Sequence, residues 1–332
     1  MRWIAVWILL LICAGCSPAD DAADNRQPAA PGSPTKLDPV TLQLNWFPEA
    51  EHGGYYAALV KGYYRQAGLD VTIQPGGGNT PVVQEVALGR AQFGVANADD
   101  ILFARAQDAH VVAVMAPLQT SPRCLIVHEK AGIKNFDDLH DLTLAVKPGA
   151  AFADYLRLKA PLKNVQIVPY TGSVQQFLRD EHYAQQGYVF SEPYVARENG
   201  GDPQVLMLAD LGFNPYTSLL FTTNKRLDTQ PDLVRRMVAA SIRGWADYLE
   251  NPASTNQRIH ELNPEMDLPA LAYGATAIRP LVETVESGTR GIGRMELERW
   301  QSLERQLVET GQLKPDKVVP QDAFSAQFLP PR

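Results

Sequence analysis

The residues from Leu44 to Tyr64, LNWFPEAEHGGYYAALVKGYY, bring together side chains that could bind or transform a small molecule. An amide at Asn45 can both donate and accept hydrogen bonds, and His52 can donate, accept or exchange a proton. The rings of Trp46 and Tyr55 could stack on a planar ligand. The alternatives are a loop histidine bonded to backbone and aromatic rings that only pack the protein interior. We expect a ligand platform here.

Further candidates follow other predicted strands or begin predicted helices: Gly77, Asn97, Asp99, Ser121, Glu192, Tyr194 and Tyr216. Glu192, in FSEPY, could accept two donors from an aminopyrimidine edge, or it could cap the helix that follows. Asp99 and its neighbour Asp100 precede another helix, which one of them could cap. The glycines of PGGGN lack the lysine and serine of a phosphate-binding loop, so we interpret Gly77 as a place of close backbone approach or a turn.

Composition excludes some classes of function. The 332 residues carry a formal net charge of -7 and no long basic run, so we expect no nucleic-acid partner. The six histidines show no zinc-binding spacing such as HExxH, so we expect neither a metal site nor a cofactor. A hydrophobic content of 45% suffices for one large or two moderate domains.

The first residues, MRWIAVWILLLICAGCS, are typical of an export signal. Their apolar run is too short to cross a bilayer comfortably and is followed by small residues. The end of the run, Ala14-Gly15-Cys16, resembles a bacterial lipobox, so we expect a signal peptide over 1–15 and lipid on Cys16. A signal cleaved without lipidation is the alternative. Residues 16–38 are rich in Ala, Asp and Pro and predict a flexible tether. The protein would then be anchored to membrane on the periplasmic side of the cell envelope.

From residue 40 the pattern alternates between short apolar runs and helical segments. Strands are expected at 40–46, 69–75, 91–97 and 110–118, with a helix at 54–68. A similar alternation follows, with strands at 142–149, 165–170 and 187–193, and long helices at 230–252, 268–283 and 294–311 close the chain. This rhythm predicts an α/β protein with two mainly parallel sheets flanked by helices. Ligands would bind where loops at the carboxyl ends of the strands face each other.

Several blocks together resemble a known family. NWFPEAEHGGYYAALVKGYYRQAGLDV, LGRAQFGVANADDILFARAQ and SEPYVARENGGDPQVLMLADLGFNPYTSLLF resemble the thiamine-pyrimidine precursor family of ABC-transporter substrate-binding proteins. The resemblance implies a two-lobed type II periplasmic-binding-protein fold, with one lobe of 39–122 plus 213–332 and another of 123–212. It also implies a monomer that captures a thiamine-pyrimidine precursor or similar nitrogen heterocycle between its lobes. Its partners would be an ABC permease and ATPase.

The same family includes a pyridoxal-phosphate-dependent pyrimidine synthase, which is the enzymatic alternative. That resemblance implies a lysine such as Lys61, a sacrificial histidine such as His52 and a cysteine-rich stretch. Only Cys124 remains after processing, so we expect a binding protein and no enzyme. Riboflavin is an alternative ligand. Sulfonates and nitrate are further alternatives, because Arg123 and Lys147 could bind an anion. A sensory lipoprotein with the same fold is a further alternative.

Overall fold

A computed structural model describes residues 36–283 and 291–330. The export signal, Cys16 and most of the expected tether lie outside the described residues. Within those residues, no helix combines the length and the apolar character needed to cross a membrane.

The first sheet is built from the N-terminal part of the chain and one later strand. Its order is β2-β1-β3-β10-β4. The bounds are β1 Asp38–Gln43, β2 Leu69–Gln74, β3 Phe93–Ala96, β4 Val111–Met115 and β10 Leu219–Thr223. Every residue of β3 and β4 is buried, as expected of apolar strands that are covered on both faces. The helices of this part are η1 Ala50–His52, α1 Gly53–Val60, α2 Tyr63–Gln66, α3 Val82–Ala87 and α4 Ala98–Ala106.

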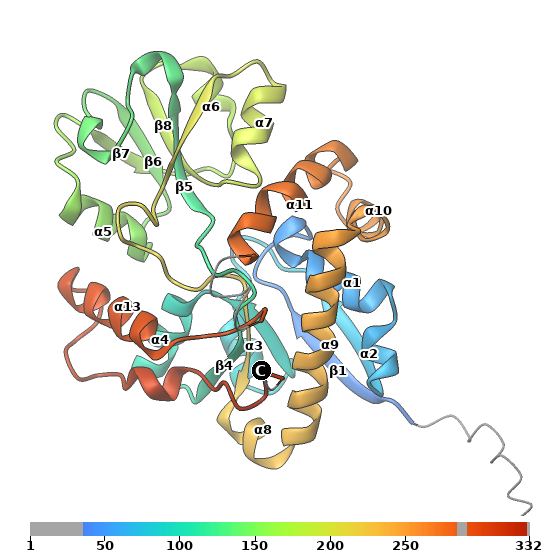
Figure 1. The fold of residues 1–332 in the computed structure, drawn as a ribbon. Coiled ribbons are helices and arrows are strands. Elements are labelled where there is room, and N and C mark those ends of the chain that lie inside the picture. Colours follow the sequence, from blue (N-terminus) through green and yellow to red (C-terminus); the bar gives the residue numbers. More distant parts are fainter. Residues whose placement is uncertain (1–35, 284–290, 331–332) are drawn as a thin grey trace, which may run out of the picture. The chain divides into compact units, whose positions relative to one another are not determined.

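The second sheet comes from the middle of the chain, the green to yellow-green segment of Figure 1. Its order is β7-β6-β8-β5-β9. The strands are β5 Arg123–His128, β6 Thr143–Val146, β7 Gln166–Pro169, β8 Tyr183–Tyr188 and β9 Pro203–Met207. The helices are η2 Glu129–Ala131, η3 Phe136–Asp138, α5 Ala151–Lys159, α6 Gln175–Arg179 and α7 Glu192–Glu198. All five strands lie within 123–207, and on this basis we propose lobe boundaries at 122–123 and 212–213.

The C-terminal part is mainly helical. Its elements are α8 Asn224–Thr229, α9 Pro231–Glu250, α10 Ala253–Leu262, α11 Leu268–Val282, α13 Leu297–Glu309 and η4 Pro320–Ala323. The long helix α9 packs closely on α1. A Cβ atom at Gly244 would lie 2.1 Å from the backbone oxygen of Gly54, so only glycine fits at this contact.

The α/β class with two sheets is confirmed, but the sheets are mixed. β1 pairs in parallel with β2 and β3, whereas β10 is antiparallel to both β3 and β4. In the second sheet β6 is parallel to β7 and β8, and β5 is antiparallel to β8 and β9. Each sheet therefore places one antiparallel strand among parallel ones, which the βαβ rhythm did not indicate.

Two expected elements differ from the structure, and one helix was not expected. The helix expected over 54–68 is interrupted at Gly62, whose φ of 72° is left-handed and ends the helical run. The strand expected at 187–193 lies at 183–188, because the polar residues Gln185 and Gln186 pair with β5. A helix at 253–262 was missed. Polar strand residues and a helix rich in Asn, Gln and Thr weaken the periodic signal on which such predictions depend.

Candidate functional site

The loop after β1 presents two aromatic rings to solvent. Trp46 and Phe47 lie edge to face with ring centroids 5.5 Å apart, and they are 37% and 52% exposed. The glycine loop after β2 lies against them: a Cβ at Gly77 would lie 3.2 Å from the Phe47 ring, and one at Gly78 would lie 3.2 Å from the Trp46 ring. Exposed aromatic rings on a loop are costly unless they contact something. Trp46 and Gly77 are thus brought together at a surface suited to a flat ligand.

The same loop continues into a buried polar group around His52. Its Nε2 lies 3.0 Å from Asn45 Oδ1 and 3.2 Å from Glu51 Oε1, and the imidazole is fully buried. Burial lowers the pKa of His52 to about 3, so the ring is neutral at physiological pH. A neutral imidazole that donates from Nε2 fits these two oxygen acceptors. Among the described residues Nδ1 has no hydrogen-bond partner.

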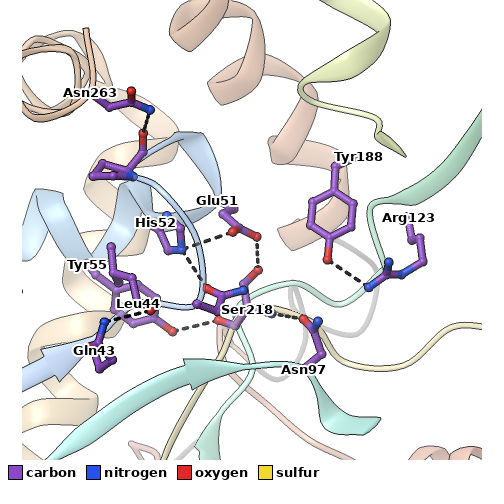
Figure 2. A network of polar contacts seen from close by, with 12 residues as sticks. Gln43, Leu44, Glu51, His52, Tyr55, Asn97, Arg123, Tyr188, Ser218 and Asn263 are labelled. Atoms are coloured by element: carbon purple, nitrogen blue, oxygen red, sulfur yellow. Dashed lines mark hydrogen bonds and ion pairs between the residues drawn. The ribbon is translucent and has the colours of Figure 1, made fainter. Parts of the chain in front are cut away.

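Ser218 connects this loop to the loop after β3 (Figure 2). Its hydroxyl donates to Glu51 Oε2 at 2.8 Å, and its backbone N–H donates to Asn97 Oδ1 at 3.2 Å. Its carbonyl oxygen accepts the hydroxyl of Tyr55 at 3.0 Å. Ser218 has a φ of 51°, a conformation that costs energy for a residue with a side chain. These three bonds offset that cost and bring three separate segments to one point.

Two acidic side chains of the loop are buried. Burial raises the pKa of Glu51 to about 7, opposed by the hydrogen bond from Ser218 and the charge of Arg123. Burial, together with the charges of Glu51 and Glu192, raises the pKa of Glu49 well above its usual range. Glu49 is only 7% exposed, and its carboxyl group has no hydrogen-bond or ion-pair partner within 36–283 and 291–330. The site therefore holds carboxyl protons near neutral pH, and these groups would repel an anionic ligand once they ionise.

Glu192 begins α7 and is held by its own lobe. Its Oε1 accepts the Tyr170 hydroxyl at 2.8 Å, and its Oε2 accepts the Tyr188 backbone N–H at 2.7 Å. Burial raises the pKa of Glu192 although both hydrogen bonds and the charge of Arg123 oppose the shift. Each oxygen retains capacity for a second donor. The structure thus fixes the position of the carboxylate without saturating it.

Arg123 brings positive charge to this region. Its guanidinium donates to the Tyr188 hydroxyl at 3.2 Å (Figure 2) and lies over the ring of Phe152, 4.6 Å from the centroid. Asp99 and Asp100 lie near enough for their charges to act on it. Asp100 also accepts the backbone N–H of Asn97 at 3.1 Å, which caps α4 as the sequence allowed.

The remaining candidates have other surroundings. Tyr55 is fully buried with its ring edge to face against Trp245, and Tyr216 is 2% exposed and accepts the backbone N–H of Glu296. Ser121 is also fully buried. None of the three side chains is exposed to a ligand in this structure, so we leave them out of the proposed contacts. Tyr194 is half-buried and stacks on Tyr273 of α11, with ring centroids 4.9 Å apart.

Sequence reasoning missed several residues of this region: Phe47, Glu51, Tyr188 and Ser218. Phe47 and Glu51 lie within the stretch from Leu44 to Tyr64. That stretch was predicted to bind a ligand, but its neighbouring residues were chosen instead of these two. Ser218 stands inside the third block that resembles the family and Tyr188 stands just before it, but their roles depend on strand pairing. A hollow of about 390 Å³ beside β5 and β8, lined in part by His128, His140 and His182, contains none of the expected site residues. No three His, Cys, Asp or Glu side chains are grouped as metal ligands in the described parts of the chain.

Comparison with known proteins assigns this chain to a family. The family model described as NMT1/THI5 like matches residues 49–255, more than half of the chain. The chain belongs to the NMT1/THI5-like family. The matched range begins at Glu49 and includes His52, Asp99, Arg123 and Glu192, so most of the candidate site lies within it.

Two relatives match nearly the whole length of this chain, and a third matches about two thirds of it. The riboflavin-binding protein RibY of Chloroflexus aurantiacus is 27% identical, covering 98% of this chain and 96% of that protein. The formylaminopyrimidine-binding protein of Halalkalibacterium halodurans is 23% identical, covering 97% of both. A 4-amino-5-hydroxymethyl-2-methylpyrimidine phosphate synthase of Legionella pneumophila is 24% identical over 69% of this chain and 75% of its own.

The fold has solved counterparts. The periplasmic aliphatic sulphonate binding protein SsuA of Escherichia coli superposes with a TM-score of 0.68 at 16% identity, covering 86% of this chain and 91% of that one. At this identity the likeness concerns the fold alone. The expected two-lobed type II periplasmic-binding-protein fold is therefore confirmed.

Proposed function

We propose that this protein is the substrate-binding component of an ABC importer and that it captures a flat nitrogen heterocycle between its two lobes. The observation that carries the proposal is the exposed Trp46–Phe47 pair on the same loop as the buried carboxyl groups of Glu49 and Glu51. The aromatic rings would cover a planar ring face, and the polar groups would contact its nitrogen-bearing edge. Relatives named for riboflavin and for formylaminopyrimidine support this ligand class.

The acidic surroundings also support a neutral or cationic heterocycle over a sulfonate or nitrate. Burial and then the charges of Glu51 and Glu192 raise the pKa of Glu49, and burial and the charge of Glu192 raise that of Glu51, while the charge of Arg123 opposes the second shift. Transfer of an anion into such surroundings would be opposed by charge repulsion and by loss of hydration.

Ligand titration tests the proposal. Purified protein would be titrated calorimetrically with riboflavin, a formylaminopyrimidine, a hydroxymethyl-aminopyrimidine, pyridoxal and ethanesulfonate. We expect at least one planar nitrogen heterocycle to bind with micromolar or lower Kd and ethanesulfonate to give no heat. Binding of ethanesulfonate without any heterocycle would overturn the proposed ligand class.

We further propose that the chain performs no chemistry on its ligand. Lys61, the lysine considered for a pyridoxal phosphate linkage, stands at the end of α1 and forms an ion pair with Asp247 at 3.5 Å. Cys124 is fully buried. Absorbance after addition of pyridoxal phosphate checks this: a Schiff-base band that disappears in Lys61→Ala would argue for the synthase instead.

We also propose that the protein is exported and anchored through lipid on Cys16, on the periplasmic side of the cell envelope. The sequence of the first residues and the similarity to a periplasmic binding protein support this. Mass spectrometry of the mature protein would reveal a diacylglyceryl N-terminus, and Cys16→Ser would release the protein from the membrane fraction. Ordinary cleavage with no added lipid mass would contradict the anchor.

A further inference from the structure

Arg123 and Tyr188 are directly opposite each other in the antiparallel pairing of β5 and β8. The guanidinium lies over two aromatic rings, 4.6 Å from the centroid of Phe152 and 5.2 Å from that of Tyr188. Ring contacts of this kind hold the planar guanidinium in one orientation. Its Nη2 donates to the Tyr188 hydroxyl, which keeps its own proton free to donate elsewhere.

Most donors of this guanidinium have no protein partner. Within the described residues the Arg123 side chain forms no ion pair, and its one hydrogen bond goes to Tyr188. A guanidinium carries five N–H donors, and leaving several of them unpaired at a half-buried site is unfavourable. Arg123 and Tyr188 therefore present a fixed set of donors that requires acceptors.

An acceptor lies in the same region. Asp99 Oδ1 is a buried oxygen without a hydrogen-bond partner among the described residues, and the charge of Asp99 acts on Arg123. The charges of Asp99, Asp100 and Glu51 act on the guanidinium. The pKa values of Asp100 and Glu51 are raised to about 7, so an anion would compete with these carboxylates for Arg123 once they ionise, whereas a neutral carbonyl oxygen can accept its hydrogen bonds without repulsion.

We propose that Arg123 and Tyr188 donate hydrogen bonds to ring carbonyl oxygens of the ligand while Asp99 accepts an N–H from the same ring. This inference rests on the proposed function and deepens it by naming the ligand class. The matching chemistry is a cyclic imide, in which an N–H stands between two carbonyl groups. Uracil-type pyrimidinediones and the isoalloxazine ring of flavins both carry that edge. An aminopyrimidine would direct its amino donors at the donors of Arg123 and Tyr188.

The test uses ligands that differ in this edge. Wild-type protein would be titrated with riboflavin, N3-methylriboflavin, uracil and a hydroxymethyl-aminopyrimidine, with flavin fluorescence or calorimetry as the readout. We expect a cyclic imide to bind more tightly than the aminopyrimidine. Methylation of N3 should weaken flavin binding at least tenfold, because it removes the proton that Asp99 accepts. Comparing the affinities for riboflavin and uracil shows whether the protein binds a flavin or a pyrimidinedione.

Variants assign the effect to the residues. Arg123→Gln should weaken imide binding at least tenfold, and Tyr188→Phe should weaken it two- to tenfold while keeping the aromatic ring. Arg157→Gln, on α5 of the same lobe and paired with Asp154 at the surface, should bind as wild type does. Circular dichroism would verify folding, and Tyr188→Phe carries the test if Arg123→Gln does not fold.

Two results would overturn the inference. One is unchanged imide affinity in both folded variants, and the other is wild-type protein that prefers the aminopyrimidine. The second result would leave the proposed function standing. Absence of binding to every heterocycle would instead remove the proposed function together with this inference.

Discussion

Glu51 Oε1 lies 3.2 Å from Nε2 of His52, yet the two residues do not form a charged pair. Burial lowers the pKa of His52 to about 3 and raises that of Glu51 to about 7. The imidazole is therefore neutral, and the carboxyl group is the partner that titrates near physiological pH. The contact between the two side chains and the hydrogen bond between His52 and Asn45 link the start of α1 to the loop after β1.

This relationship predicts how Glu51 affects stability with pH. The folded state holds a proton on Glu51 up to about pH 7, whereas the unfolded chain releases it near its usual value of 4.5. The contribution to stability is present below pH 4.5 and is lost as pH rises through 7. Glu51→Gln removes this dependence, so the variant should gain about 3 kcal/mol relative to wild type between pH 4.5 and pH 8.

Urea unfolding at several pH values between 5 and 8 measures this difference. The exposed Glu261→Gln serves as the control and should show no such trend, since Glu261 is about half exposed beside Arg258. A difference between Glu51→Gln and wild type that stays constant with pH would argue against a raised pKa at Glu51.

Trp46→Ala should weaken ligand binding at least tenfold, about 1.4 kcal/mol, without unfolding the protein. The indole is 37% exposed, so its removal leaves little cavity, but a stacked ring face would be lost. Calorimetric titration with the best ligand measures the change. Leu88→Ala is the control, because Leu88 is 65% exposed and stands outside the site. Equal affinity in Trp46→Ala and wild type would assign Trp46 to packing.

Gly244→Ala should destabilise the protein by about 1–3 kcal/mol, although alanine usually favours a helix interior over glycine. The added methyl group would lie 2.1 Å from Gly54 O and 2.7 Å from the Ala58 side chain, which forces α9 away from α1. Ala239→Ser, at an exposed position of the same helix, should change the free energy of unfolding by less than about 0.5 kcal/mol. A more stable Gly244→Ala variant would show that the two helices are farther apart.

Tyr194 and Tyr273 should be energetically coupled. Their rings lie 4.9 Å apart at 28°, and the Tyr273 hydroxyl donates to Val189 O at 3.2 Å. A double-mutant cycle of Tyr194→Leu and Tyr273→Leu should give a coupling of about 0.5–1.5 kcal/mol in the free energy of unfolding. Tyr194→Leu combined with Phe47→Leu should be additive. Additivity in both pairs would mean that the stack contributes nothing measurable.

Much of the fold could be predicted from local patterns. The apolar runs of β3 and β4 and the long amphipathic helices α9, α11 and α13 fall where periodicity and composition place them. One continuous helix was predicted over 54–68 because the helical pattern continues through Gly62. That glycine is left-handed in the structure and ends the helix. The missed strand at Gln185 and Gln186 has polar side chains, which carry no sequence signal of burial.

The candidate site was predictable only in part. Asn45, Trp46, His52 and Glu192 could be chosen because polar or aromatic residues follow strands at the edge where ligands bind in α/β proteins. Tyr55 and Tyr216 share those features, yet both lie in the interior, Tyr55 against Trp245 and Tyr216 against Trp300. A tyrosine suits either place, since its ring is apolar and its hydroxyl needs a partner.

The sequence by itself determined the alternation of strands and helices, the loop that carries Trp46 and His52, and the membership of the family. These depend on contacts between residues that are near in the chain, or on motifs that stand in order. The tertiary structure alone decided that Ser218 connects Glu51 to Asn97 and that Arg123 faces Tyr188. Those pairs are far apart in sequence and meet only through antiparallel strand pairing and long-range packing, which local propensities do not encode.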